Sequence, residues 1–64
     1  MEIKQYIDKN VMIIADNGKI FSGKVEDFLY SDENGFGEDS IIVRSKNDLI
    51  EFVLSDILHI EEQL

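Results

Sequence analysis

VMIIADNGKIFSGKVEDFLY, residues 11–30, contains two apolar-rich runs on either side of Asn17-Gly18. Asn-Gly is the strongest short-range sign of a β-hairpin, because a type I′ turn needs positive φ at both central residues. Asn tolerates that conformation and Gly adopts it freely. The stretch therefore predicts two antiparallel strands joined by a two-residue loop.

A two-residue loop also predicts the register of the hairpin. Asp16 would face Lys19, and Ile14 would face Phe21. Because side chains alternate between the two faces of a strand, one set of apolar residues is expected to share a face. That set is Met12, Ile14, Phe21 and Val25.

Gly23 interrupts the second run, which at residues 19–30 is long for a strand of a small domain. Gly inside a strand marks a bend, a bulge or the close approach of another backbone. A bend at Gly23 would let the strand take part in two sheets. The pattern predicts a small, strongly curved β-barrel.

The rest of the chain adds a helix and three more strands to this prediction. Ile3, Tyr6 and Ile7 have the spacing of one apolar helical face, which predicts a short helix over residues 2–9. Period-two alternation predicts the strands, and polar turn residues separate them. The predicted segments are a flexible acidic loop at 31–39, strands at 40–45, 49–54 and 57–60, a tight turn at 46–48 and a frayed tail at 61–64.

Composition limits the class of protein. The 64 residues are expected to form a single domain, 1–64, and the absence of Cys excludes disulfides, thiolate nucleophiles and Cys-based zinc sites. No apolar run approaches the roughly 20 residues that cross a bilayer. No signal-peptide pattern opens the chain. A cytoplasmic location without membrane contact is therefore expected.

The net charge of the chain argues against a surface that binds the phosphate groups of nucleic acid. Six basic and fourteen acidic side chains give a formal net charge of −8, whereas proteins that bind nucleic acid through phosphates carry basic patches. The cations are scattered along the chain at Lys4, Lys9, Lys19, Lys24, Arg44 and Lys46. Solvation of a small domain accounts for the acidic excess.

Two spacings point to a known family. Gly18 follows the first turn, Gly23 comes five residues later, and apolar residues follow at Val25 and Phe28. The last strand has an apolar-x-x-apolar pattern at Ile57 and Ile60. In these motifs and in its order of elements, the chain resembles the Sm-like (LSm) family. The resemblance implies a mostly β fold: a short N-terminal helix followed by a five-stranded, strongly bent antiparallel barrel of the Sm-like or SH3-like kind.

The resemblance also implies where RNA would be bound. The family usually has Asp and Asn in its first motif and Arg-Gly before the last strand. The corresponding positions here, with Asn34 one step out of register, are Leu29, Glu33, Asn34, Val53 and Leu54. Because these residues differ from the family's RNA contacts, we expect a non-enzymatic module that assembles on itself or on a partner protein. The alternative is an Sm-like protein that contacts RNA as an oligomeric ring, in which the scattered cations would be gathered.

Self-association is the further expectation from the resemblance. In the Sm-like family the fourth strand of one subunit pairs with the fifth strand of the next, and here these strands would be residues 49–54 and 57–61. Apolar side chains on alternate positions would otherwise be left in water beside an unpaired edge. The predicted oligomer edge consists of Leu49, Val53, Ile57, Leu58 and Ile60.

Two other features resemble functional sites but lack the residues that such sites need. The acidic loop 32–39 invites a calcium site, but Phe36 and Val43 stand where an EF-hand places ligands. His59 has only Ser55 as a nearby nucleophile, and neither a nucleophile elbow nor an oxyanion-hole motif accompanies it. No catalytic residue, metal site or cofactor is therefore expected, and enzyme activity is not expected either.

Overall fold

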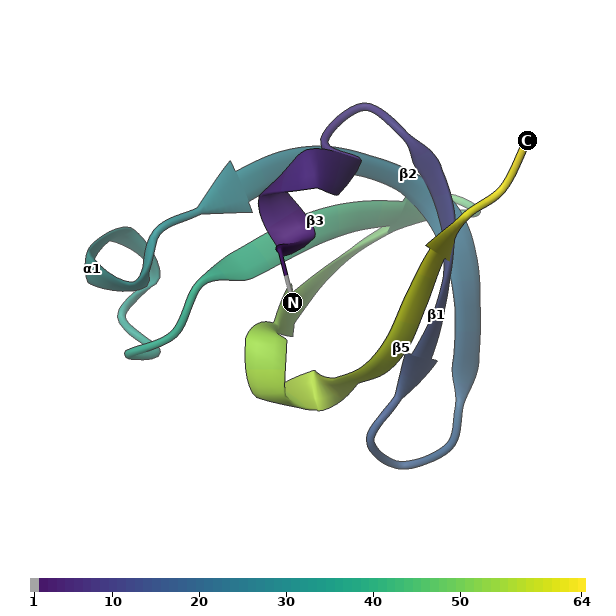
Figure 1. The fold of residues 1–64 in the computed structure, drawn as a ribbon. Coiled ribbons are helices and arrows are strands. Elements are labelled where there is room, and N and C mark those ends of the chain that lie inside the picture. Colours follow the sequence, from purple (N-terminus) through teal and green to yellow (C-terminus); the bar gives the residue numbers. More distant parts are fainter. Residues whose placement is uncertain (1) are drawn as a thin grey trace.

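Five antiparallel strands form one sheet in the order β4-β3-β2-β1-β5 (Figure 1), in a computed structural model that describes residues 2–64. The strands are β1 (Asn10–Ala15), β2 (Ile20–Leu29), β3 (Ser40–Ser45), β4 (Asp48–Val53) and β5 (Ile57–Glu62). The other elements are the 3-10 turns η1 (Ile3–Tyr6) and η2 (Leu54–Asp56) and the one-turn helix α1 (Ser31–Asn34). The prediction of a mostly β, antiparallel fold is confirmed.

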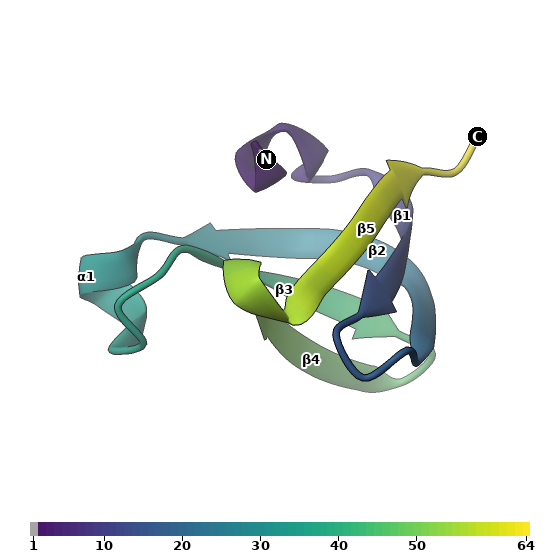
Figure 2. The ribbon, with the colours of Figure 1, turned by 60° about the horizontal axis from the view of Figure 1, so that its bottom comes forward.

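β2 is the strand that joins the two halves of the sheet. Residues 20–24 pair with β1, and residues 24–29 pair with β3. The register with β3 shifts between Val25 and Asp27, so Glu26 forms a bulge, and a bulge bends and twists the strand that carries it. Figure 1 and Figure 2 show β2 curving from one half of the fold to the other.

The β1–β2 hairpin differs from its prediction in loop length. The Gly18 N–H donates to the Ala15 carbonyl (2.9 Å), and the Ala15 N–H donates to the Lys19 carbonyl (2.8 Å). The loop therefore has three residues, 16–18, and only Gly18 takes a positive φ, of 85°. This is the hairpin that combines a type I turn with a Gly bulge. The predicted two-residue loop is wrong.

The extra loop residue shifts the register by one position. Ile13, and not Ile14, faces Phe21. A one-residue shift moves every side chain of a strand to the opposite face. In β1 the buried side chains are accordingly those of Val11, Ile13 and Ala15, while the predicted Met12 and Ile14 are only half-buried.

The sheet is not closed, so the predicted barrel is wrong in that respect. β4 and β5 are its two edges and do not pair with each other. The connection between them bonds to other segments: the Leu54 N–H donates to the Asp39 carbonyl (3.0 Å), and the Asp16 N–H donates to the Asp56 carbonyl (2.8 Å). Figure 2 shows β4 and β5 running in different directions, with a turn leading into β5.

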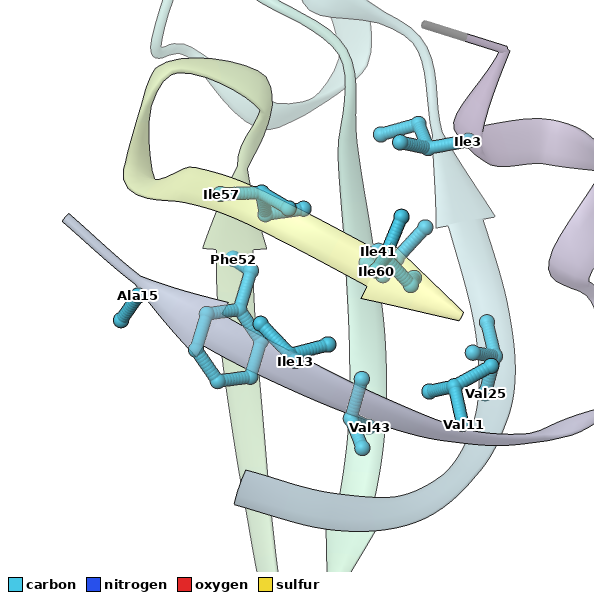
Figure 3. Packing of buried hydrophobic residues seen from close by; sticks show 10 residues of the cluster. All are labelled: Ile3, Val11, Ile13, Ala15, Val25, Ile41, Val43, Phe52, Ile57 and Ile60. Atoms are coloured by element: carbon cyan, nitrogen blue, oxygen red, sulfur yellow. The ribbon is translucent and has the colours of Figure 1, made fainter. Parts of the chain in front are cut away.

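The core fills the curved inner face of the sheet (Figure 3). β3 and β4 place alternate residues on this face as predicted, and Ile3 of η1 adds a buried side chain from outside the sheet. Phe21, Ile50 and Leu54 pack against it from half-buried positions. Among residues 2–64, the buried apolar residues are Ile3, Val11, Ile13, Ala15, Val25, Ile41, Val43, Phe52, Ile57 and Ile60.

Both ends of the described chain depart from prediction. The helix expected over residues 2–9 is a 3-10 turn of four residues, because the Asp8 N–H donates to the Val25 carbonyl (2.8 Å) and draws the chain into the ladder of β2. β5 extends to Glu62, and the Gln63 N–H donates to the Asn10 carbonyl (2.7 Å). Residues 61 and 62 are therefore not frayed. Within residues 2–64, no helix has the length and apolar character needed to cross a membrane.

Candidate functional site

Within residues 2–64, β4 has no neighbouring strand on one side of its backbone. Ser45 faces Asp48 across the two-residue loop between β3 and β4, and hydrogen-bonded and non-hydrogen-bonded pairs alternate along the strands from that point. The N–H and C=O groups on the free side consequently belong to Leu49, Glu51 and Val53. β4 thus presents an unpaired strand edge.

β5 presents the second unpaired edge. The hydrogen bond from Gln63 to Asn10 sets the alternation along the β1–β5 ladder. Ile60 and Glu62 therefore direct their backbone groups away from β1, and Leu58 lies at the register shift next to them. Both edges of the open sheet are available for pairing.

The predicted oligomer edge residues divide into two groups. Leu49 on β4 and Leu58 on β5 are 56% and 63% exposed, and Val53 is half-buried. Ile57 and Ile60 are buried in the core at 6% and 7% exposure. These two isoleucines belong to strand β5, but their side chains are part of the core and not of the surface.

Three of the five positions predicted for RNA contact, Leu29, Asn34 and Val53, meet at one end of β2, β3 and β4. Ser40 faces Leu29 on one side and Val53 on the other. The Asn34 side-chain amide donates to the Ser40 hydroxyl (2.8 Å). The structure therefore brings distant parts of the sequence together around Ser40, a residue that the sequence did not single out.

The remaining two of these positions serve as local anchors. The Leu54 N–H donates to the Asp39 carbonyl, as noted above, and Glu33 accepts a hydrogen bond from the Tyr30 N–H (2.9 Å). None of the five side chains is basic. These positions therefore lack the positive charge that the binding of phosphate groups requires.

Ser40 is the fully buried polar side chain in this region, and its hydroxyl is satisfied in both directions. It accepts from Asn34 and donates to Glu51 (2.6 Å). Asn34 also donates to the Glu38 carbonyl (2.7 Å). These bonds connect α1 to β3 and β4, so the segment expected to be a flexible loop is held against the sheet.

Two carboxylates of the acidic loop accept hydrogen bonds from other segments of the protein. Asp39 accepts from the Ser31 N–H (3.0 Å), and Glu38 accepts from both the N–H and the hydroxyl of Ser55 (2.8 and 2.7 Å). No group of three or more His, Cys, Asp or Glu side chains among the described residues is placed to hold a metal ion. The loop carries a structural network.

His59 and Ser55 do not form a catalytic pair. His59 lies 2.8 Å from Glu61 on the outer side of β5, and both side chains are exposed. The Ser55 hydroxyl instead donates to Glu38. A nucleophile needs a base within hydrogen-bond reach, and here the hydroxyl is bonded to a carboxylate of another segment.

Lys4 links η1 to the end of β2. Its ammonium group donates to the Tyr30 hydroxyl (2.6 Å) and lies 5.0 Å from the centre of the Tyr30 ring and 5.7 Å from that of Phe28. The two rings meet edge to face. The hydrogen bond with Tyr30 raises the pKa of Lys4. The Phe28 and Tyr30 rings are thus both in contact with a neighbouring cation.

Glu26 and Arg44 form an ion pair across β2 and β3. The Arg44 Nε lies 2.5 Å from Glu26 Oε2. This hydrogen bond lowers the pKa of Glu26 and raises the pKa of Arg44. The pair closes over the bulge at Glu26, a feature that no local sequence pattern marked.

The open hollows on the surface formed by residues 2–64 include two that border the sheet. The first, of about 570 Å³, is lined by Ile20, Phe21, Ser22, Ser45, Lys46, Asp48 and Ile50. The second, of about 510 Å³, is lined by Glu26, Asp27, Ile42, Leu49 and Glu51. Comparison of the chain with protein-family models finds no match, and comparisons with curated proteins and with solved structures find none either.

Proposed function

We propose that this protein is a non-enzymatic assembly module of the Sm-like type, in which β4 of one copy pairs with β5 of the next or with a strand of a partner protein. The sheet order carries this proposal, because β4 and β5 are the two edges of a single sheet. Each copy offers one unpaired strand on each side. Such a head-to-tail contact closes into a ring when the rotation between copies fits.

Exposed apolar side chains on both edges support the proposal. Leu49 and Leu58 are more than half exposed, and full burial of a leucine stabilises by roughly 1.5–3 kcal/mol. Soluble proteins usually protect unpaired strand edges. Pairing would satisfy the free backbone groups and cover both leucines.

Charge opposes assembly. Each added copy brings a net charge of −8, and Glu51 and Glu62 lie on the two strands that would meet. Salt screens this repulsion over about 10 Å at 0.1 M. We therefore expect a homo-oligomer that loosens as ionic strength falls.

Light scattering coupled to gel filtration tests the proposal with a matched set of variants. Leu58→Asp and Leu49→Asp place a charge on the two edges without touching the core. Ile20→Asp is the control, because Ile20 is equally exposed, at 64%, but lies on the interior strand β2. At moderate salt the wild type and Ile20→Asp should be oligomers, while both edge variants should be monomers of 7.4 kDa. A monomeric wild type at both low and moderate salt would refute the proposal.

RNA binding by an oligomeric ring is the second candidate. It is favoured by the meeting of Leu29, Asn34 and Val53 around Ser40 at one end of the sheet. The net charge and the absence of a basic side chain among these positions oppose it. Fluorescence anisotropy with oligo-U and oligo-A separates the candidates. Sub-micromolar binding that weakens with salt would establish the second candidate over the first.

A further inference from the structure

The outer face of β2, β3 and β4 contains the second of the two hollows, which we call the acidic hollow. It is lined by Glu26, Asp27, Ile42, Leu49 and Glu51. Its floor is apolar, since Ile42 lies on the strand between the two others and Leu49 is 56% exposed. Its rim consists of carboxylates. The hollow is therefore an apolar sheet surface bordered by negative charge.

Strand register places two of the carboxylates on either side of one apolar residue. Ile42 faces Asp27 on β2 and Glu51 on β4. Neighbouring strands lie about 4.8 Å apart, so the backbones of Asp27 and Glu51 are separated by about 10 Å. The row across the sheet is acidic, apolar and acidic.

Among residues 2–64, these two carboxylates have only neutral hydrogen-bond donors as partners. Glu26 has Arg44 as its partner. Asp27 accepts a hydrogen bond from the Phe28 N–H (2.8 Å), and Glu51 accepts one from Ser40. Within residues 2–64, neither Asp27 nor Glu51 forms an ion pair. Two carboxylates that form no ion pair among the described residues therefore border Ile42.

We propose that the acidic hollow binds an extended segment of a partner protein in which Lys or Arg alternates with aliphatic residues. The alkyl stem of a Lys or Arg side chain can lie on Ile42 while its charged end reaches Asp27 or Glu51. Aliphatic side chains on such a segment cover Leu49. Complementary charge of this kind provides specificity and speeds association. The site lies on the face of the sheet, and it shares Leu49 with the β4 edge of the proposed assembly, so the bound segment and a neighbouring copy would compete for that side chain.

A synthetic peptide of alternating Lys and Leu is the probe. Binding is measured by calorimetry, and the contact is located by amide chemical shifts of the labelled protein. The test variant is Asp27→Asn combined with Glu51→Gln, since the amide oxygens still accept the bonds from Phe28 and Ser40. The control is Asp16→Asn combined with Asp32→Asn, which removes the same charge from two exposed positions, one in the β1–β2 loop and one in α1.

The peptide should shift the resonances of residues 26, 27, 42, 49 and 51. The hollow variant should bind at least about tenfold more weakly, and the control should lose less than about twofold. Equal losses in the two variants would show only long-range attraction to an acidic protein. Unchanged affinity in the hollow variant would place the peptide elsewhere, such as along the edge of β4. The same shifts produced by spermine at equal affinity would indicate a general polycation site. Each of these three results overturns the proposal.

Discussion

Gly23 on β2 lies directly against the carbonyl group of Arg44 on β3, so a methyl group at Gly23 would overlap the Arg44 oxygen and carbon. The obstacle is backbone within the paired sheet, which cannot move aside as a flexible side chain can. Gly23→Ala should lower the free energy of unfolding by about 3 kcal/mol, at the upper end of overpacking effects. Urea unfolding measures the loss. Ser22→Ala, at an exposed neighbouring position, should change stability by less than about 0.5 kcal/mol. Equal effects of the two changes would contradict this explanation.

Ser40 should stabilise the end of the sheet through its two hydrogen bonds. Ser40→Ala leaves the Asn34 amide and the Glu51 carboxylate without this partner, which should cost about 1–3 kcal/mol. Hydrogen exchange should also become faster over residues 31–39, because α1 loses its connection to β3. An unchanged exchange rate in this segment would show that α1 is held by other contacts.

Glu26 should titrate below its ordinary value of 4.5, because the hydrogen bond with Arg44 lowers its pKa. A lowered pKa in the folded state gives stability that is present above pH 4.5 and is lost as pH falls through the folded-state value. The effect on stability should be small and sensitive to salt, since both side chains are exposed to solvent.

NMR titration of the Glu26 carboxyl carbon measures this shift. Arg44→Gln should return the midpoint toward 4.5. Lys24→Gln should have a much smaller effect, because Lys24 contributes only a weak charge interaction. A midpoint of 4.5 in the wild type would contradict the ion pair.

Calcium should not stabilise the fold, since the carboxylates of Asp39 and Glu38 already accept hydrogen bonds from the protein. A ligand that binds only the native state with micromolar Kd would add about 4 kcal/mol at millimolar concentration. Thermal unfolding with calcium and with a chelator should give the same Tm. A rise of several degrees that disappears in Asp32→Asn combined with Asp39→Asn would reverse this conclusion.

The strands could be predicted because their alternation is local. β3 begins and ends at the predicted residues, and the inward side chains of β4 are those expected from period two. The structure of the segment before β1 was harder to predict than that of the strands. The spacing of Ile3, Tyr6 and Ile7 suits a helix, but so short a helix is marginal by itself. The hydrogen bond from the Asp8 N–H to the Val25 carbonyl joins residues that are far apart in the sequence, so local spacing could not predict it.

The hairpin shows the limit of a strong local pattern. Asn17-Gly18 fits a two-residue loop, yet Gly18 also suits the last position of a three-residue loop. The bond from Asp16 to Asp56 and the burial of Ile13 belong to the tertiary structure. Neither this hydrogen bond nor this burial can be predicted from Asn17 and Gly18 alone.

The exposure of two predicted edge residues, Leu49 and Leu58, could be predicted from the sequence. Leu49 and Leu58 followed from apolar residues left over after the core was assigned, whereas Ile57 and Ile60 were needed by the core itself. The acidic hollow could not be predicted, because Asp27, Ile42 and Glu51 meet only through the registers of two separate strand pairs. The bulge at Glu26 sets one of those registers.

The position of β5 in the sheet determines the order in which the sheet can form. The β1–β2 and β3–β4 hairpins close loops of three and two residues, while the β1–β5 ladder joins Val11 to Glu62. Local contacts form quickly, and closing a long loop costs more entropy. On the ribosome, β5 is the last of the five strands to be synthesised. We expect the other four strands to pair first. The edge of β1 in the nascent chain would then stay unpaired until β5 is synthesised.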